Sequence, residues 1–163
     1  MAEILEDSQM LLPAFELKRE NRWVLEWDGI DSYLVRQFAR PQANMGEVTL
    51  DFINGKRYFQ GKFEWSTSQF VLTDPITPSQ AQKVMEWVRL GFENITGRAG
   101  YKEFYTAKNF KLKLLDPVGA VVEQWDYINA FLSSVDFGSL DYTSAEPTKV
   151  TCTIRFDMAI HQF

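Results

Sequence analysis

Cysteine and histidine are nearly absent from this chain of 163 residues, which contains each of them once, as Cys152 and His161. A disulfide framework within the chain is therefore excluded, and so is a zinc site built from a cluster of Cys and His. No apolar run approaches the length of a membrane-spanning helix. The acidic start M-A-E-I-L-E-D lacks the basic and apolar regions of a secretory signal. We expect a protein that folds in the cytoplasm and that does not insert into a membrane.

An excess of basic charge is also missing, because 22 acidic residues outnumber 17 basic ones and the net charge is -5. Proteins that grip nucleic acid rely on cations that neutralise phosphates. The charge therefore argues against a protein that holds DNA or RNA tightly. It is compatible with a protein that lets DNA pass.

Alternation of apolar and polar residues is clearest near the C-terminus. In residues 148–158 the even positions are mostly apolar and the odd positions are polar and rich in Thr. Residues 110–115 alternate in the same way, and the sequence D-P-V-G at 116–119 has the Pro and Gly of a tight turn. This pattern predicts one long strand over 148–158 and, around the turn, two antiparallel strands.

Two further hairpins are predicted in the N-terminal half. Residues 22–27 alternate as a strand, and residues 33–39 are interpreted as its returning partner after the turn at 28–31. Residues 47–52 alternate again, and Asn54-Gly55 is placed for a two-residue type I′ turn before a return strand that ends near Gly61.

One amphipathic helix is predicted at about residues 78–92. Thr77 is the expected cap, with Pro78 at the first helical position and Gln80 completing a capping box. The fold class is therefore mainly β: a small antiparallel β-sandwich or barrel with one flanking α-helix. We expect a single domain over 1–163, with residues 1–20 as an N-terminal arm that is either partly ordered or ordered only against a neighbouring subunit.

The sequence contains few residues or motifs that would support catalysis. A nucleophilic pair would need Cys152 in contact with His161, whereas Cys152 lies on the apolar side of a predicted strand. The loop N-I-T-G-R-A-G at 94–100 lacks the sequence of a P-loop. The acidic residues at 136–146 are typical of turns around Gly138. We expect no enzymatic activity, no cofactor and no metal site.

A chain with this much predicted strand has edge strands whose backbone N–H and C=O groups need hydrogen-bond partners. Unpaired edge strands must be protected or paired with another chain. A ring of identical copies related by rotation abolishes such edges.

The order of motifs in the C-terminal half resembles that of a known family. D-P-V-G at 116–119 is followed by V-V-E-Q-W at 121–125, then by A-F-L-S-S-V-D-F-G-S-L-D-Y-T-S at 130–144, and then by a T-x-T-x-R-F-D strand at 151–157. This order is similar to that of the tail tube proteins of contractile-tailed bacteriophages, which are related to type VI secretion tube proteins. The resemblance covers roughly residues 45–157.

The resemblance implies a structural virion protein that assembles into stacked hexameric rings, the inner tube of a contractile tail that delivers the genome. Its implied partners are other copies of itself, the tail sheath protein, and the tape measure and baseplate proteins, with DNA passing through the lumen unbound. Under it we expect contacts between rings at the following positions, although the same side chains could instead fold back on their own domain: Val48, Leu50, Phe52, Asn54, Gly55, Tyr58, Leu11, Leu12, Phe15 and Phe163. The candidates for the lumen wall are Glu47, Asp51, Glu123, Asp126 and Asp157.

Other interpretations stay open. The first forty residues do not follow the pattern of the family, which leaves room for a baseplate protein or tube initiator of the same fold. A monomeric ligand-binding β-barrel would also give alternating strands, but it would contain an apolar cavity. A β-sandwich hydrolase would need opposed carboxylates or a nucleophile beside a base.

Overall fold

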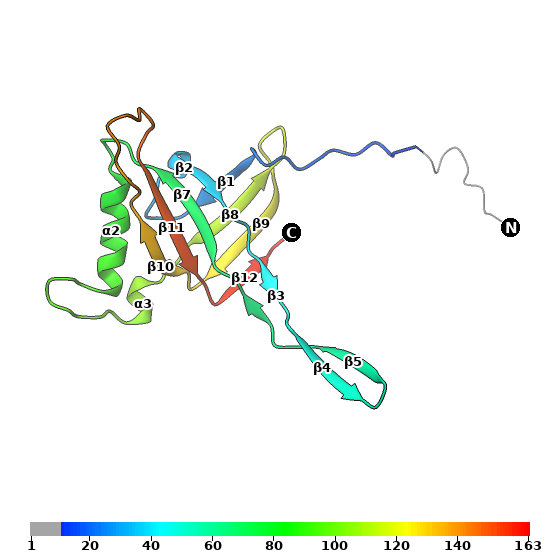
Figure 1. The fold of residues 1–163 in the computed structure, drawn as a ribbon. Coiled ribbons are helices and arrows are strands. Elements are labelled where there is room, and N and C mark those ends of the chain that lie inside the picture. The colour runs from blue at the N-terminus through cyan, green and yellow to red at the C-terminus, as the bar shows by residue number, and fades with distance from the viewer. Residues whose placement is uncertain (1–10) are drawn as a thin grey trace.

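Two antiparallel sheets of four strands face one another in the computed structural model, which describes residues 11–163 (Figure 1). The first sheet has the order β1 (Trp23–Glu26), β8 (Phe110–Leu115), β9 (Val121–Ile128) and β12 (Met158–His161). The second sheet has the order β10 (Phe131–Asp136), β11 (Lys149–Arg155), β7 (Ser68–Thr73) and β2 (Val35–Phe38). The predicted mainly β class and sandwich are confirmed.

Aromatic side chains fill the space between the two sheets. The rings of Phe110 and Tyr127 meet nearly at right angles with centroids 5.4 Å apart, and Phe70 lies 6.1 Å from Phe110. Strand alternation explains this core, because Val150, Cys152 and other alternate residues on these strands point inward and are buried. Packed side chains therefore occupy the space between the sheets in which a ligand-binding barrel would have its cavity.

The last part of the chain changes sheets. β11 ends at Arg155 in the second sheet, and β12 begins at Met158 in the first. The prediction of one strand over 148–158 is therefore wrong. The burial pattern shifts by one residue at the break: Phe156 is buried at the crossover, whereas Met158, which continues the apolar pattern in the sequence, is exposed and Ala159 is buried in its place.

The first predicted hairpin is also wrong. β1 pairs with β8, whereas β2 pairs with β7 in the opposite sheet. A short 3-10 helix, η1 (Ser32–Leu34), separates the two strands, and the adjacent Leu34 and Val35 are both buried. Two successive inward side chains break the period of a single strand, so the chain enters the second sheet here.

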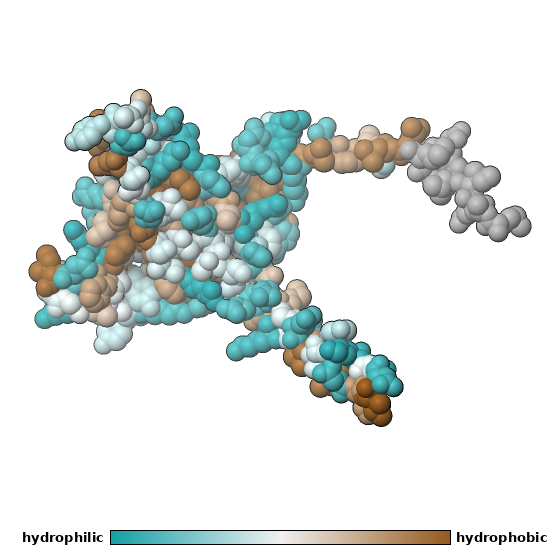
Figure 2. Space-filling model, in the orientation of Figure 1, coloured by the Kyte–Doolittle hydropathy of each residue, from teal (hydrophilic) through white to brown (hydrophobic). Residues whose placement is uncertain are grey.

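The hairpin predicted around residues 48–58 is confirmed as β4 (Glu47–Phe52) and β5 (Gly55–Gln60), and it projects from the sandwich (Figures 1 and 2). The short pair β3 (Ala43–Asn44) and β6 (Glu64–Trp65) forms its base. Phe52 pairs with Gly55, so Ile53 and Asn54 form the turn. Neither turn residue has a positive φ, and the type I′ turn predicted at Asn54-Gly55 is therefore wrong.

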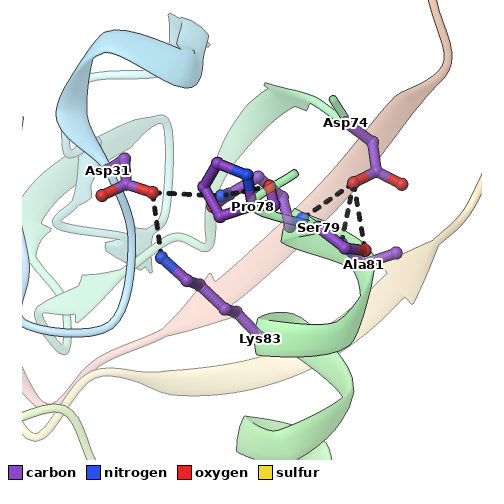
Figure 3. Close-up of polar contacts among 7 residues, drawn as sticks. Asp31, Asp74, Pro78, Ser79, Ala81 and Lys83 are labelled. Carbon is purple, nitrogen blue, oxygen red and sulfur yellow. Dashed lines mark hydrogen bonds and ion pairs between the residues drawn. The ribbon is translucent and has the colours of Figure 1, made fainter. Parts of the chain in front are cut away.

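The predicted helix is α2 (Gln80–Gly91), which runs beside the sheets (Figure 1). Its cap is Ser79 rather than Thr77: the Ser79 hydroxyl accepts from the Gln82 amide, and an Asp74 carboxylate oxygen accepts from the amides of Gln80 and Ala81 (Figure 3). A second, short helix, α3 (Lys102–Tyr105), was not predicted.

Two contacts fix α2 to the sandwich. Lys83 Nζ lies 2.9 Å from Asp31 Oδ2 (Figure 3). Trp87 is buried, and its ring centroid lies 4.2 Å from that of Trp27. The Trp87 indole N–H donates to the Tyr105 carbonyl at 2.6 Å, which joins α2 to α3.

Candidate functional site

The β4–β5 hairpin extends away from the domain as a two-stranded ribbon (Figure 1). Every residue of both strands is exposed. At its base the Gly61 amide donates to the Gly46 carbonyl, and a Cβ on Gly61 would come within 3.0 Å of the Glu47 amide nitrogen. Glycine therefore permits the close approach of the two chains where the ribbon leaves the domain.

Residue pairing gives the hairpin two different faces. Residues directly opposite one another share a face, and the face alternates along each strand. Val48 pairs with Phe59 and Leu50 with Arg57, so these residues and Phe52 form one largely apolar face. Glu47, Thr49, Asp51, Lys56 and Tyr58 form the other, polar face.

Large apolar side chains of the hairpin are open to water. Phe52 is 78% exposed and Ile53 is 85% exposed, and brown residues gather at the hairpin tip in Figure 2. Of the residues predicted to mediate contacts, Val48, Leu50 and Phe52 lie together on the apolar face, whereas Tyr58 lies on the polar face. Asn54 is in the turn and Gly55 follows it.

The described part of the predicted arm, residues 11–20, runs outward from the sandwich without regular structure (Figure 1). Leu11, Leu12 and Phe15 on it are all exposed. Residues 1–10 of the arm lie outside the described residues. Phe163, at the other end of the chain, does not project in the same way, because its carbonyl accepts from the Gln124 amide and holds the tail along β9.

The candidates for a lumen wall are not all together. Glu47 and Asp51 share the polar face of the hairpin, where Lys56 lies 3.5 Å from Asp51. Asp126, on β9, accepts from the side chains of Gln124 and Gln162. Asp157, at the crossover between sheets, accepts from Lys102 and Asn129, and these bonds, the Lys102 bond first, lower its pKa below the usual range.

Glu123 differs from the other four candidates because it points inward and is only 5% exposed. It therefore presents no exposed carboxylate to a lumen in the single chain. Lys18 Nζ lies 2.6 Å from one carboxylate oxygen, while the Trp125 indole donates to the other and Arg40 lies 3.6 Å from it. Burial alone raises the pKa of Glu123, but these three partners outweigh it and bring the pKa below its usual value.

Sequence reasoning missed several of these features. Ile53, Phe59 and Leu17 are exposed apolar residues of the hairpin and the arm that were not named. The anchoring of the arm by Lys18 to Glu123 was missed as well. The sequence did contain a local signal for Phe59. When the turn is placed at Ile53-Asn54 instead of Asn54-Gly55, Phe59 pairs with Val48 and shares its face of the hairpin.

Cys152 and His161, the pair considered for nucleophilic catalysis, lie in different sheets. Cys152 is buried in the second sheet, and burial raises its pKa to about 12. His161 lies in the first sheet with its ring 4.6 Å from that of Trp125. Within residues 11–163, no group of three His, Cys, Asp or Glu could hold a metal ion. Nor does that part of the chain contain a helix long and apolar enough to cross a membrane.

Comparisons with known proteins identify the fold. No protein-family model and no curated protein sequence matches the chain. Among solved structures, a chain of the extended sheath–tube complex of the PVC extracellular contractile injection system superposes with a TM-score of 0.71 at 14% identity, over 98% of this chain and 99% of that chain. A chain of the six-fold symmetrised baseplate of the anti-feeding prophage gives 0.65 at 12% identity, over 93% and 97%.

A third structure extends the likeness to a more distant group. Hcp1 from Flavobacterium johnsoniae superposes with a TM-score of 0.51 at 13% identity, over 86% of this chain and 94% of that chain. The chain thus has the fold found in structures of contractile injection systems and of Hcp1. At these identities the likeness establishes the fold, and the function must be argued from the residues.

Proposed function

We propose that this protein is a structural subunit of the tube of a contractile tail or injection apparatus, where it assembles with copies of itself into stacked rings. The observation that carries the proposal is the β4–β5 hairpin, which projects into water with an apolar face that its own domain leaves uncovered. The shared fold supports the same assignment.

The β4–β5 hairpin would be stabilised by a neighbouring subunit that covers its apolar face. A two-stranded hairpin on its own is marginally stable in water. Exposed contiguous apolar surface of this kind marks a site of protein association. A neighbouring subunit that covers Leu50 and Phe52 would remove both problems, and it would leave the polar face, with Glu47 and Asp51, open to water. That polar face is the best candidate for part of a lumen wall.

The finer details of the assembly follow the family resemblance. Six copies in a ring agree with the six-fold symmetry stated for the anti-feeding prophage baseplate. A sheath around the tube and a baseplate at its end are the proposed partners, together with a tape measure protein inside. Delivery of a phage genome, without specific binding of DNA, is the proposed use of the tube. No enzymatic step is part of this role.

A second function of the same class is supported by one comparison. The anti-feeding prophage baseplate chain matches over nearly its whole length. A baseplate or tube-initiating subunit would form a ring of its own, but it would not polymerise into a long tube. The length of the assembly therefore separates the two functions.

The test is electron microscopy of purified protein, alone and with a tube-initiating complex, for hollow six-fold rings or tubes. A variant with Leu50→Ser and Phe52→Ser should lose assembly and keep its melting temperature, because both side chains are exposed. The matched control is Ile95→Ser with Tyr101→Ser, two exposed apolar residues remote from the hairpin in sequence, which should assemble as the unchanged protein does. A protein that stays monomeric under every one of these conditions contradicts the proposal.

A further inference from the structure

A basic cleft of about 400 Å³ opens beside β1 and β2, the strands at the ends of the two sheets. Its apolar lining includes Trp23, Phe38 and Leu112. Its basic residues are Lys18, Arg19, Arg36 and Arg40. The cleft therefore combines an apolar floor with a cationic rim, in a chain whose net charge is -5.

Part of this positive charge has no acidic partner among residues 11–163. Lys18 and Arg40 both pair with Glu123. Within residues 11–163, the Arg36 guanidinium donates to the uncharged Thr73 hydroxyl alone, and Arg19 has no ion-pair partner. Among the described residues that line the cleft, Glu20 alone is acidic. An acidic segment is the charge-complementary ligand for such a rim.

The N-terminal arm has this composition. Residues 1–17 contain four acidic residues and neither Lys nor Arg, and the sign of the charge changes abruptly at Lys18-Arg19; the acidic residues are Glu3, Glu6, Asp7 and Glu16. In the described part, residues 11–17 run outward from the sandwich (Figure 1), and Leu12 and Phe15 are exposed.

We propose that residues 1–17 of one copy dock in the basic cleft of the next copy. The acidic side chains of the arm face Arg19 and Arg36, and its apolar side chains pack on the floor. An extended segment can also pair with the free edge of β1 or β2, since each ends its sheet. Fully extended, 17 residues span roughly 55–60 Å, whereas a domain of this size has a radius of gyration of about 15 Å. The arm is long enough to reach a neighbour.

The direction of the contact matters for assembly. The arm and the cleft are different surfaces of one chain, so the contact is head-to-tail and every copy both gives an arm and receives one. Head-to-tail contacts close into rings or continue as filaments. The inference rests on the proposed function, because it names the surface through which the copies join.

Charge reversal in two full-length variants tests the contact. The arm variant carries Glu3→Lys, Glu6→Lys and Asp7→Lys, and the cleft variant carries Arg19→Glu and Arg36→Glu. Each places like charges at the contact and should lose assembly alone, whereas a mixture of the two restores opposite charges and should assemble. Arg98→Glu with Lys108→Glu, both exposed and remote from the cleft in sequence, is the control and should assemble normally. The proposal is overturned if either variant assembles on its own. It is also overturned if the mixture fails to assemble.

A cross-link gives a second readout that does not depend on rings. A Leu12→Cys chain is mixed with a Gln37→Cys chain under oxidised glutathione, and a disulfide-linked dimer of the two is expected. Ile95→Cys in place of Gln37→Cys should give far less. A chain with both changes that closes only on itself would show an arm in its own cleft, which refutes the contact between copies. If rings form but the disulfide-linked dimer does not, the arm-to-cleft contact is contradicted and the proposed function is not. If the dimer forms but no rings are seen, the proposed function is contradicted and the contact is not.

Discussion

Lys18 Nζ lies 2.6 Å from a buried carboxylate oxygen of Glu123, and this ion pair joins the root of the N-terminal arm to β9 inside the first sheet. Lys18 is half exposed, whereas the Glu123 side chain is 6% exposed. A buried carboxylate is costly without partners, and Lys18, Arg40 and the Trp125 indole supply them. The point at which the arm leaves the domain is therefore fixed.

The Glu123→Gln substitution should loosen this anchor. The amide keeps the shape of the side chain but loses the charge that holds Lys18. We expect the free energy of unfolding to fall by about 1–3 kcal/mol, measured by urea denaturation, and trypsin to cut faster after Lys18 and Arg19. Glu146→Gln, at an exposed position, is the control and should change stability by less than about 0.5 kcal/mol. Equal stabilities of the two variants would show that the ion pair is dispensable.

Acid should weaken the same anchor. The pKa of Glu123 is lowered in the folded protein, so the unfolded chain takes up the proton first as pH falls. The stabilisation is therefore complete above the unfolded value, about 4.3, and is lost as pH falls through the lowered value. The gap in urea midpoint between the unchanged protein and Glu123→Gln should be largest near pH 6 and should close below about pH 4. A gap that stays constant down to pH 3 would contradict this assignment.

Removal of Phe110 should be the most damaging change in the core. Its ring lies about 6 Å from those of Trp27, Phe38 and Phe70, and 1% of the residue is exposed. Phe110→Ala should lower the free energy of unfolding by about 3–5 kcal/mol, because the cavity cannot close against these three rings and that of Tyr127. Phe104→Ala removes the same ring from an exposed position and should cost less than about 1 kcal/mol. Chemical denaturation of both variants measures the difference.

Local sequence patterns predicted where the strands and the helix lie better than they predicted which strands pair. Alternation located β8 and β11, because each side chain in a strand sees only one side of the sheet. It could not reveal the crossover at Phe156, because Met158 continues the apolar pattern in the sequence although it is exposed and Ala159 is the residue buried in the first sheet. It also could not show that β1 and β2 belong to different sheets, because pairing depends on strands far away in sequence.

The candidate site shows the same division. Several apolar residues of the hairpin and the arm were named from the sequence, but the alternation of residues 47–52 is the same whether the apolar face is covered by its own domain or exposed. The faces of the hairpin could not be assigned until its register was known, and the register depends on a turn at Ile53 rather than at Gly55. The burial of Glu123 beneath Lys18 needed a contact across 105 positions of the chain.

Cys152 should report the opening of the second sheet. Its side chain points into the core between the two sheets and is fully buried, so the thiol stays covered until the second sheet separates from the first. Burial raises its pKa to about 12, and the reactive thiolate is therefore scarce at pH 8. We expect a maleimide reagent to label the native protein many-fold more slowly than it labels an added thiol at Ile95→Cys, which is exposed. Denaturant should bring the two rates together, because the label can enter only when the core between the two sheets opens. Fast labelling of the native thiol, in the absence of denaturant, would show that this sheet opens without global unfolding.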